Sequence, residues 1–313
     1  MMKVLITGSA GNLGSILARY LMAKDTCRLR LMVHRRDVAE DLKVAGRTEI
    51  VHADLGRPET LGAAVDGIDV VVHFAGVLFK ANPERFLPTT NTAYFRNLVD
   101  TAGLHGVPKI ILISFPHVEG PTSFDHPARG RLDGSPISVH ARTRLDEERY
   151  LLANVSGAVS LRVGMVYGRG VLMVDAARWL AKRHLLGVWR EPTQIHLISK
   201  VDFCAASAAA IASDSANGIY HLGDEGKVTL QETLDLACDR WGAARPWRMP
   251  LPLIYGAARV SELVSRVTGL ASPLTRDFLD IGRVSYYGDT TRMRNELLPV
   301  MRYPTIYDGL ETL

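Results

Sequence analysis

The chain lacks the features that mark a membrane-spanning, secreted or disulfide-stabilised protein. It contains no run of eighteen apolar residues, so the sequence predicts no membrane span. Its three cysteines, Cys27, Cys204 and Cys238, show no C-x-x-C or metal-ligand spacing, which favours free thiols in a reducing cytoplasm. The chain opens on a strand pattern without a basic region followed by an apolar one, so we expect no signal peptide.

A strong charge of one sign is also absent. The sequence has 37 Lys and Arg against 33 Asp and Glu, a net charge of +4, and its basic residues are scattered among acidic ones. This argues against a nucleic-acid-binding stripe and favours local sites for an anionic cofactor or a small-molecule substrate. With 47% hydrophobic and 22% charged residues, the chain is typical of a folded globular protein and not of a disordered one.

The most informative motif of the chain lies in its first fourteen residues. The apolar run Val4-Leu5-Ile6 leads into Gly8, Gly11 and Gly14, and a helical pattern follows. This order of strand, glycine-rich turn and helix is the one that a dinucleotide pyrophosphate needs. Gly8 permits a tight turn, Gly11 lets the backbone approach the phosphates, and Gly14 lets the helix pack closely on the strand. A chance glycine-bearing turn is the alternative.

Strand and helix patterns alternate through the first half of the chain. Strands are predicted at 3–7, 29–33, 49–52, 69–75, 109–114 and 158–163, and helices at 12–23, 58–65, 91–105 and 141–153. This alternation predicts an α/β fold with a doubly wound parallel sheet. Later helices are predicted at 172–186, 202–213, 230–241 and 253–268, and short strands near 194–198 and 218–222. We expect a dinucleotide-binding domain at 1–165 plus about 193–223, and a smaller, mainly helical substrate domain at about 166–192 and 224–313.

The segment 253–270 is amphipathic. Leu253, Ala257, Val260, Val264 and Val267 fall on one helical face. We expect this face to pack inside the smaller domain, with contact to a membrane surface as the alternative.

The end of the second predicted strand bears on which dinucleotide binds. His34, Arg35 and Arg36 follow Val33, where an acidic residue would accept the adenosine ribose hydroxyls of NAD. Arginine accommodates the 2′-phosphate of NADP instead. The sequence therefore favours NADP(H), while Asp37 keeps NAD(H) open.

Several segments together resemble the extended short-chain dehydrogenase/reductases, the NAD-dependent epimerase/dehydratase family. Residues 7–14 resemble its TGxxGxxG loop, 72–76 its fourth-strand VxHxAA/G segment, 91–99 its NxxGTxNLL helix, and 161–168 its LRPxxVYG segment with Val163 in place of proline. Residues 272–276 and 286–292 look most like the 3β-hydroxysteroid dehydrogenase branch. The resemblance implies an NAD(P)-dependent oxidoreductase or epimerase, with a possible homodimer through helices 91–105 and 141–153. The cofactor contacts that it and the glycine pattern imply are Gly8, Ser9, Gly11, Asn12, Leu13, Gly14, His34, Arg35, Arg36, Asp54, Leu55, Ala75, Gly76, Arg144 and Val163.

The catalytic positions depart from the family pattern. The family uses Ser/Thr with Tyr-x-x-x-Lys, whereas the matching segment here reads His140-Ala-Arg-Thr-Arg144, and Phe115 follows Ser114 where a second serine is expected. In one interpretation His140 exchanges the proton, because imidazole titrates near ~6.5. Arg144 then holds the ribose, Ser114 assists, and Phe115 and His117 contact an apolar alcohol or ketone, or a sugar nucleotide.

In the other interpretation the redox machinery is lost, and the fold serves cofactor sensing, partner binding or non-redox chemistry. His117, Asp125, His126 and His140 cluster in the sequence, but their spacing matches no zinc template, so no metal is predicted.

Overall fold

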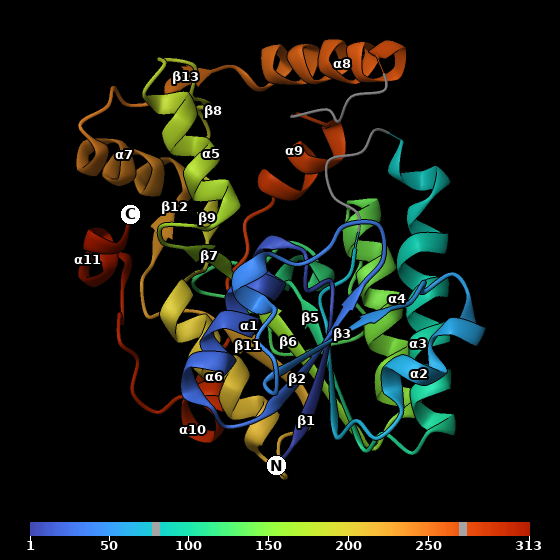
Figure 1. Ribbon diagram of the computed structural model, residues 1–313. Coiled ribbons are helices and arrows are strands. Elements are labelled where there is room, and N and C mark those ends of the chain that lie inside the picture. Colours follow the sequence, from blue (N-terminus) through green and yellow to red (C-terminus); the bar gives the residue numbers. More distant parts are fainter. Residues whose placement is uncertain (77–81, 269–273) are drawn as a thin grey trace.

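A seven-stranded parallel sheet forms the centre of the molecule (Figure 1). The computed structural model describes residues 1–76, 82–268 and 274–313. The strand order is β11-β6-β5-β4-β1-β2-β3. The strands are β1 (Lys3–Thr7), β2 (Arg28–Val33), β3 (Thr48–His52), β4 (Val70–His73), β5 (Lys109–Ser114), β6 (Gly157–Val163) and β11 (Gly218–Leu222). This order reverses direction between β1 and β4, and ligands of such sheets bind outside the carboxyl ends of the strands at that point.

Helices cover both faces of the sheet, as the alternating pattern predicts. On one face lie α1 (Asn12–Lys24) and α6 (Lys200–Ala212), whose apolar residues join the core around Ile6, Ile111 and Leu161. On the other face lie α2 (Gly62–Val65), α3 (Tyr94–Leu104) and α4 (Val139–Asn154), around Leu5, Val71 and Leu112. The central strands β1, β4 and β5 are buried on both faces, which explains why they read as apolar runs, whereas the edge strand β3 is only partly buried.

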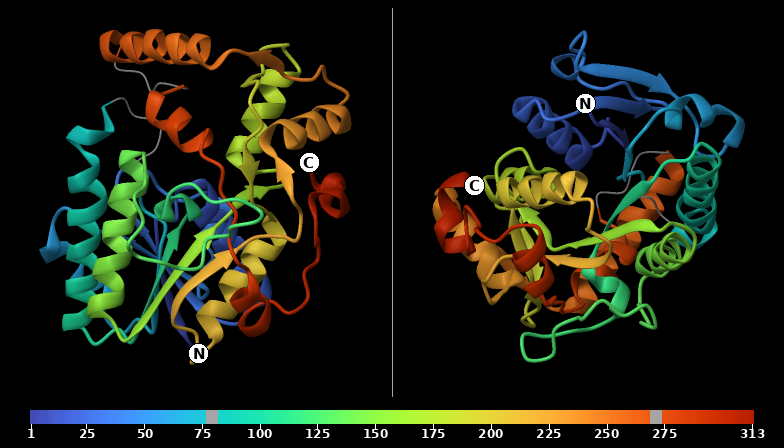
Figure 2. Two further views of the ribbon diagram at one scale, coloured as in Figure 1. Left: turned by 180° about the vertical axis from the view of Figure 1, so that it is seen from behind. Right: turned by 90° about the horizontal axis from the view of Figure 1, so that it is seen from below.

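The remaining elements stand mainly beyond the carboxyl ends of these strands (Figure 1 and Figure 2). Three two-stranded pairs are formed by β7 (Met165–Tyr167) with β10 (Leu197–Ser199), β9 (Gln194–Ile195) with β12 (Val228–Thr229), and β8 (Gly187–Trp189) with β13 (Trp247–Met249). The helices here are α5 (Leu172–Ala181), α7 (Leu230–Trp241), α8 (Leu251–Thr268), α9 (Arg276–Gly282) and α11 (Ile306–Gly309), whereas α10 (Thr291–Glu296) lies at the opposite end, beside the start of β11. Among the described residues, no helix has both the length and the apolar character that spanning a bilayer requires.

Several predicted helices differ from the structure, among them those at 172–186 and 58–65. The helix expected at 172–186 ends at Ala181, because His184 adopts a left-handed φ of 58° and the Leu185 N–H turns back to the carbonyl of Leu180. The helix expected at 58–65 is a 3₁₀ turn at Pro58–Thr60 followed by the short α2.

The expectation for the amphipathic segment is wrong for the described residues. The predicted apolar face of α8, including Leu253 and Val260, is exposed, and Ile254 and Ala258 on the opposite side make the contacts with the core. The side chain of Val267 and residues 269–270 lie outside the described part.

Candidate active site

The glycine turn has the tight geometry that its sequence predicts. Gly8 has a φ of +71°, and a Cβ there would lie 2.9 Å from the Ala75 nitrogen. A Cβ on Gly14 would lie 2.5 Å from the Gly8 carbonyl oxygen, so α1 rests directly on the turn. The helix begins after Gly11 and has no acidic residue in its first turn. Its first N–H groups and its dipole therefore favour an anion, which fits a dinucleotide pyrophosphate.

Two side chains predicted to contact the cofactor instead bind the protein. The Ser9 hydroxyl is buried and donates to the carbonyl of Met32, 2.8 Å away, joining the turn to β2. The Asn12 amide donates to the carbonyl of Gly170, and its oxygen accepts the N–H of Leu172. These residues shape the turn, and only their backbone groups remain for a phosphate.

The carboxyl end of β2 presents cationic side chains. Arg35 and Arg36 are exposed, and His34 lies 3.4 Å from the Asp54 carboxylate. The Asp37 carboxylate accepts from the Val38 N–H and forms an ion pair with Lys43, each at 2.8 Å. Leu55, next to Asp54, accepts a hydrogen bond from Asn97 through its carbonyl.

Across the cleft, α4 brings Arg144 to the end of β4. Its Nη2 lies 3.2 Å from the position of a Cβ on Gly76, and its Nη1 binds the buried carboxylate of Glu147. Burial raises the pKa of Glu147 to about 7 against the opposing effect of Arg144. Asn91 lies on the same side, and its amide donates to Thr143 of α4 at 3.2 Å. Arg144 therefore lies beside Gly76, a residue without a side chain.

His140 stands in the first turn of α4 within a group of aromatic rings. The Phe115 ring centroid lies 5.9 Å from that of His140 and 5.4 Å from that of His117, and Tyr286 lies 4.2 Å from His117. Ser114, at the end of β5, is buried, and no described residue forms a hydrogen bond with its hydroxyl. The structure thus brings the predicted residues 114, 115, 117 and 140 together.

Both histidines of this group are held neutral. Burial, and then the charge of Arg144, lowers the pKa of His140 to about 3. Burial likewise lowers the pKa of His117 to about 3. Without its charged form, the His140 ring can donate or accept one hydrogen bond at each nitrogen but cannot act as an imidazolium acid at neutral pH.

A residue far along the chain fixes the start of α4. Asp277 of α9 accepts hydrogen bonds from the backbone N–H groups of Val139 and His140, while Ser138 accepts from Ala141. Burial raises the pKa of Asp277 to about 6. Two caps from different segments hold His140 in place.

The loop after β5 is fixed by a buried ionic network. Arg162, on β6, is fully buried and binds the carboxylates of Glu148 and Glu119. Glu119 also accepts the N–H of Gly130 at 2.7 Å, so the network ties residues 119–130 to the sheet. Val163, the last residue of β6, is buried beside this network.

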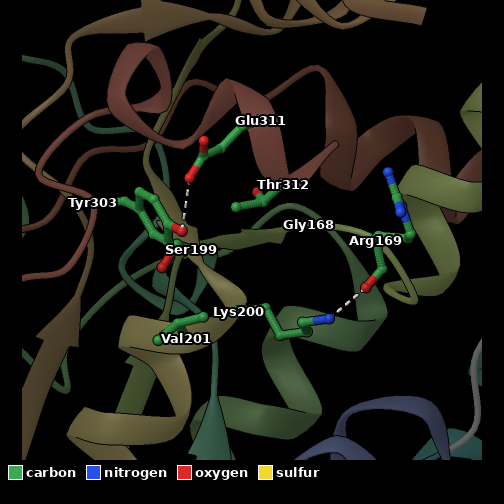
Figure 3. A pocket seen from close by; sticks show the side chains of 8 residues that line it. All are labelled: Gly168, Arg169, Ser199, Lys200, Val201, Tyr303, Glu311 and Thr312. Atoms are coloured by element: carbon green, nitrogen blue, oxygen red, sulfur yellow. Dashed lines mark hydrogen bonds between the residues drawn. The ribbon is translucent and has the colours of Figure 1, made fainter.

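A separate pocket is partly lined by the β7–α5 connection (Figure 3). It is lined by Gly168, Arg169, Ser199, Lys200, Val201, Tyr303, Glu311 and Thr312. Its polar groups bind one another: Lys200 donates to the Arg169 carbonyl and Tyr303 to Glu311. None of the predicted cofactor residues lines it, so we place the dinucleotide at the strand ends and not in this pocket.

The fold and the glycine turn are those of a Rossmann-type dinucleotide-binding protein. Residues 8–148 match the NAD(P)H-binding family model. The chain is 29% identical to the ceramide reductase of Caulobacter vibrioides over 276 residues, which are 86% of this chain and 80% of that protein. It is 30% identical to the 3 beta-hydroxysteroid dehydrogenase type 7 of Homo sapiens over 144 residues, which are 44% of this chain and 39% of that protein.

Among solved structures, a dTDP-glucose 4,6-dehydratase of Bacillus anthracis in complex with NAD has a similar fold. The TM-score is 0.77 at 15% identity, covering 100% of this chain and 95% of the other. The resemblance to this family is therefore confirmed, as is the doubly wound fold. The chain is similar to NAD(P)-dependent reductases, dehydrogenases and epimerases.

The sequence reasoning did not select three residues of this site. Asn91 and Tyr286 lay in family-like segments but received no role, and Asp277 carried no signal. Tyr286 and Asp277 reach the site from more than a hundred positions away in the sequence, and no local pattern reports such a contact.

Proposed function

We propose that the protein is an NAD(P)H-dependent reductase of an apolar ketone, or a dehydrogenase of the corresponding alcohol. The observation that carries this proposal is the series of ring contacts that joins His140 to Phe115, Phe115 to His117 and His117 to Tyr286. Such an aromatic group suits an apolar substrate better than a sugar nucleotide. The names of the two relatives, a ceramide reductase and a 3 beta-hydroxysteroid dehydrogenase, denote apolar substrates and support this choice.

In this proposal His140 acts as a neutral hydrogen-bond donor. A bound nicotinamide would supply the hydride. His140 would direct an imidazole N–H at the substrate oxygen, where negative charge develops, as a neutral histidine can do at a helix N-terminus. The alkoxide would take its proton from solvent water as the alcohol leaves the site. Arg144 adds a fixed positive charge and holds the ribose hydroxyls, while the rings of Phe115 and Tyr286 exclude water from the reacting carbonyl.

We also propose NADP(H) as the preferred dinucleotide. Arg35 and Arg36 are exposed at the end of β2, where a 2′-phosphate would lie. The carboxylate of Asp37 is already held by Lys43 and the Val38 N–H, which leaves it less available for ribose hydroxyls.

The division into 1–165 with about 193–223, and about 166–192 with 224–313, stands as our proposal for the two domains. It is supported by β11, which joins the main sheet beside β6, and by α6, which packs on that sheet.

The test measures deuterium transfer from stereospecifically labelled NADPH to a panel of apolar ketones. We expect transfer to at least one ketone. His140→Phe should abolish turnover while dinucleotide affinity stays within a few-fold. His126→Phe, the same change at an exposed histidine, serves as the matched control and should keep full activity. Full turnover by His140→Phe would refute the role of His140.

A second function is favoured by one observation. His140 is neutral and the position of the second serine is occupied by Phe115, so the site lacks the family's usual proton donors. A dinucleotide-binding protein without redox activity would bind NADPH but transfer no deuterium to any ketone of the panel. That pair of results would replace the first proposal by this one.

A further inference from the structure

The outer face of α8, made of Leu253, Ala257, Val260 and Leu263, is an exposed apolar stripe on an 18-residue helix. The exposed fractions are 63% for Leu253, 62% for Val260 and 59% for Leu263. In Figure 1 and in the left view of Figure 2, α8 lies across one end of the molecule as its outermost element. Four apolar residues spaced along one side of a helix therefore face outward.

Two polar residues of α8, Glu262 and Tyr255, face α9 instead. The Glu262 carboxylate is buried and pairs with Arg276 of α9 at 3.0 Å. The Tyr255 hydroxyl donates to Asp280, also of α9, at 2.5 Å. Ile254 and Ala258 pack against Val188 and Leu279. The inward side of α8 already has its apolar and ionic partners, so the outward stripe is not needed for the packing of the helix. Exposed apolar patches of this kind mark sites that bind another apolar surface.

Further apolar side chains lie at the same end. Trp247, in β13 just before α8, is 63% exposed, and its indole N–H is bonded to the carbonyl of His184. Leu185 is also exposed, and it precedes β8, the strand that pairs with β13. An exposed tryptophan beside an apolar helix is typical of side chains that sit at a membrane interface.

Exposed cationic residues belong to α8 and to the segments next to β8 in the chain. Lys182 and Arg183 follow α5, Arg190 follows β8, and Arg259 lies on α8 itself. None of these four forms an ion pair with a carboxylate among residues 1–76, 82–268 and 274–313. An apolar stripe bordered by uncompensated positive charge matches a bilayer that carries anionic lipids. A second copy of the chain docking through the same face would place these like charges against one another.

We propose that the outer face of α8, with Trp247 and Leu185, docks on the surface of an anionic lipid bilayer. Docking is peripheral, with the apolar side chains at the headgroup boundary. The surface is also close to the candidate site, because α8 packs on α9, and Asp277 of α9 caps the helix that carries His140. The proposal does not depend on catalysis, since binding to lipid is measured without substrate.

The test is co-sedimentation of the full chain with large vesicles of phosphatidylcholine, with and without phosphatidylglycerol. We expect binding to the vesicles that contain phosphatidylglycerol, and weaker binding in high salt. The double variant Leu253→Asp, Val260→Asp should bind at least about tenfold more weakly. Leu104→Asp is the matched control: Leu104 is 88% exposed at the end of α3, at the opposite end of the strands, and its change should leave binding intact.

Unfolding curves and NADPH affinity check that the double variant is folded, since both substituted positions are exposed and distant from the glycine turn. Three outcomes overturn the proposal. One is the absence of binding to the anionic vesicles, and another is equal binding by the double variant. The third is a solution dimer that the double variant dissociates while vesicles bind neither form, which would assign the face to a second copy.

Discussion

The neutral state of His140 has a consequence for stability that can be measured. Burial and Arg144 lower the pKa of its ring to about 3 in the folded chain. In the unfolded chain the ring titrates near its ordinary value of ~6.5. Between these two values the unfolded state holds a proton that the folded state does not, so acidification favours unfolding. His140 thus weakens the fold as the pH falls from about 6.5 toward 3.

The size of the effect follows from the two pKa values. A pH of 5 lies about 1.5 units below the pKa of the ring in the unfolded chain, and each unit is worth about 1.4 kcal/mol. The free energy of unfolding is therefore about 2 kcal/mol lower at pH 5 than at pH 8. His73, His117 and His196 are also buried with lowered pKa values and act in the same direction. The contribution of His140 therefore has to be isolated by substitution.

The measurement is urea unfolding of the unmodified chain and of His140→Phe at pH 5 and pH 8. Phenylalanine removes the titrating group, so the stability of the variant relative to the unmodified chain should rise by about 2 kcal/mol at the lower pH. Phe115→Leu is the control, because it disturbs the same ring contact without removing a titrating group. Its stability difference should be the same at both pH values. An unchanged difference for His140→Phe would refute a neutral, buried His140.

Three further predictions concern other parts of the structure. Gly14→Ala should destabilise the fold by about 1–3 kcal/mol and weaken dinucleotide binding more than about tenfold, because its Cβ would lie 2.5 Å from the Gly8 oxygen. Glu148→Gln should cost about 3 kcal/mol in urea unfolding, because it leaves a fully buried arginine without its full counter-charge. The double change Arg35→Ser, Arg36→Ser should weaken NADPH binding about tenfold in calorimetry and leave NADH binding nearly unchanged.

Each of these has a distinct contradicting result. Gly103→Ala is the control for Gly14→Ala, because a Cβ on Gly103 meets nothing within 4 Å. The control should stabilise α3 by about 0.5–1 kcal/mol. Equal effects of Gly14→Ala and Gly103→Ala on stability would count against the close packing at Gly14. A neutral effect of Glu148→Gln would show that the buried network adds nothing to stability. Equal losses of NADPH and NADH affinity would show that the two arginines do not read the 2′-phosphate.

Most of the main sheet could be predicted from the sequence, because most of its strands are short and mainly apolar with a turn signal at the end. β1, β5 and β11 have the predicted bounds; β2, β3 and β6 begin one residue earlier than predicted, and β4 begins one residue later and ends two residues earlier. The helix predicted at 91–105 begins instead as a π-helical turn at Pro88–Ala93, before α3. Helix ends depend on contacts made after the helix has docked, which is why these bounds were harder to predict.

The sequence alone determined the glycine turn and the alternation of strands and helices, and it led to the hypothesis that His140 and Phe115 depart from the family pattern. These are local properties, written in spacing and residue type within about twenty positions. Only the tertiary structure decided the surroundings of His140: Tyr286 and Asp277 arrive from distant segments, and burial beside Arg144 sets the proton affinity of its ring. It also decided which side of α8 faces outward. An amphipathic pattern predicts that a helix has an apolar and a polar face. The elements that pack against the helix determine which face remains exposed.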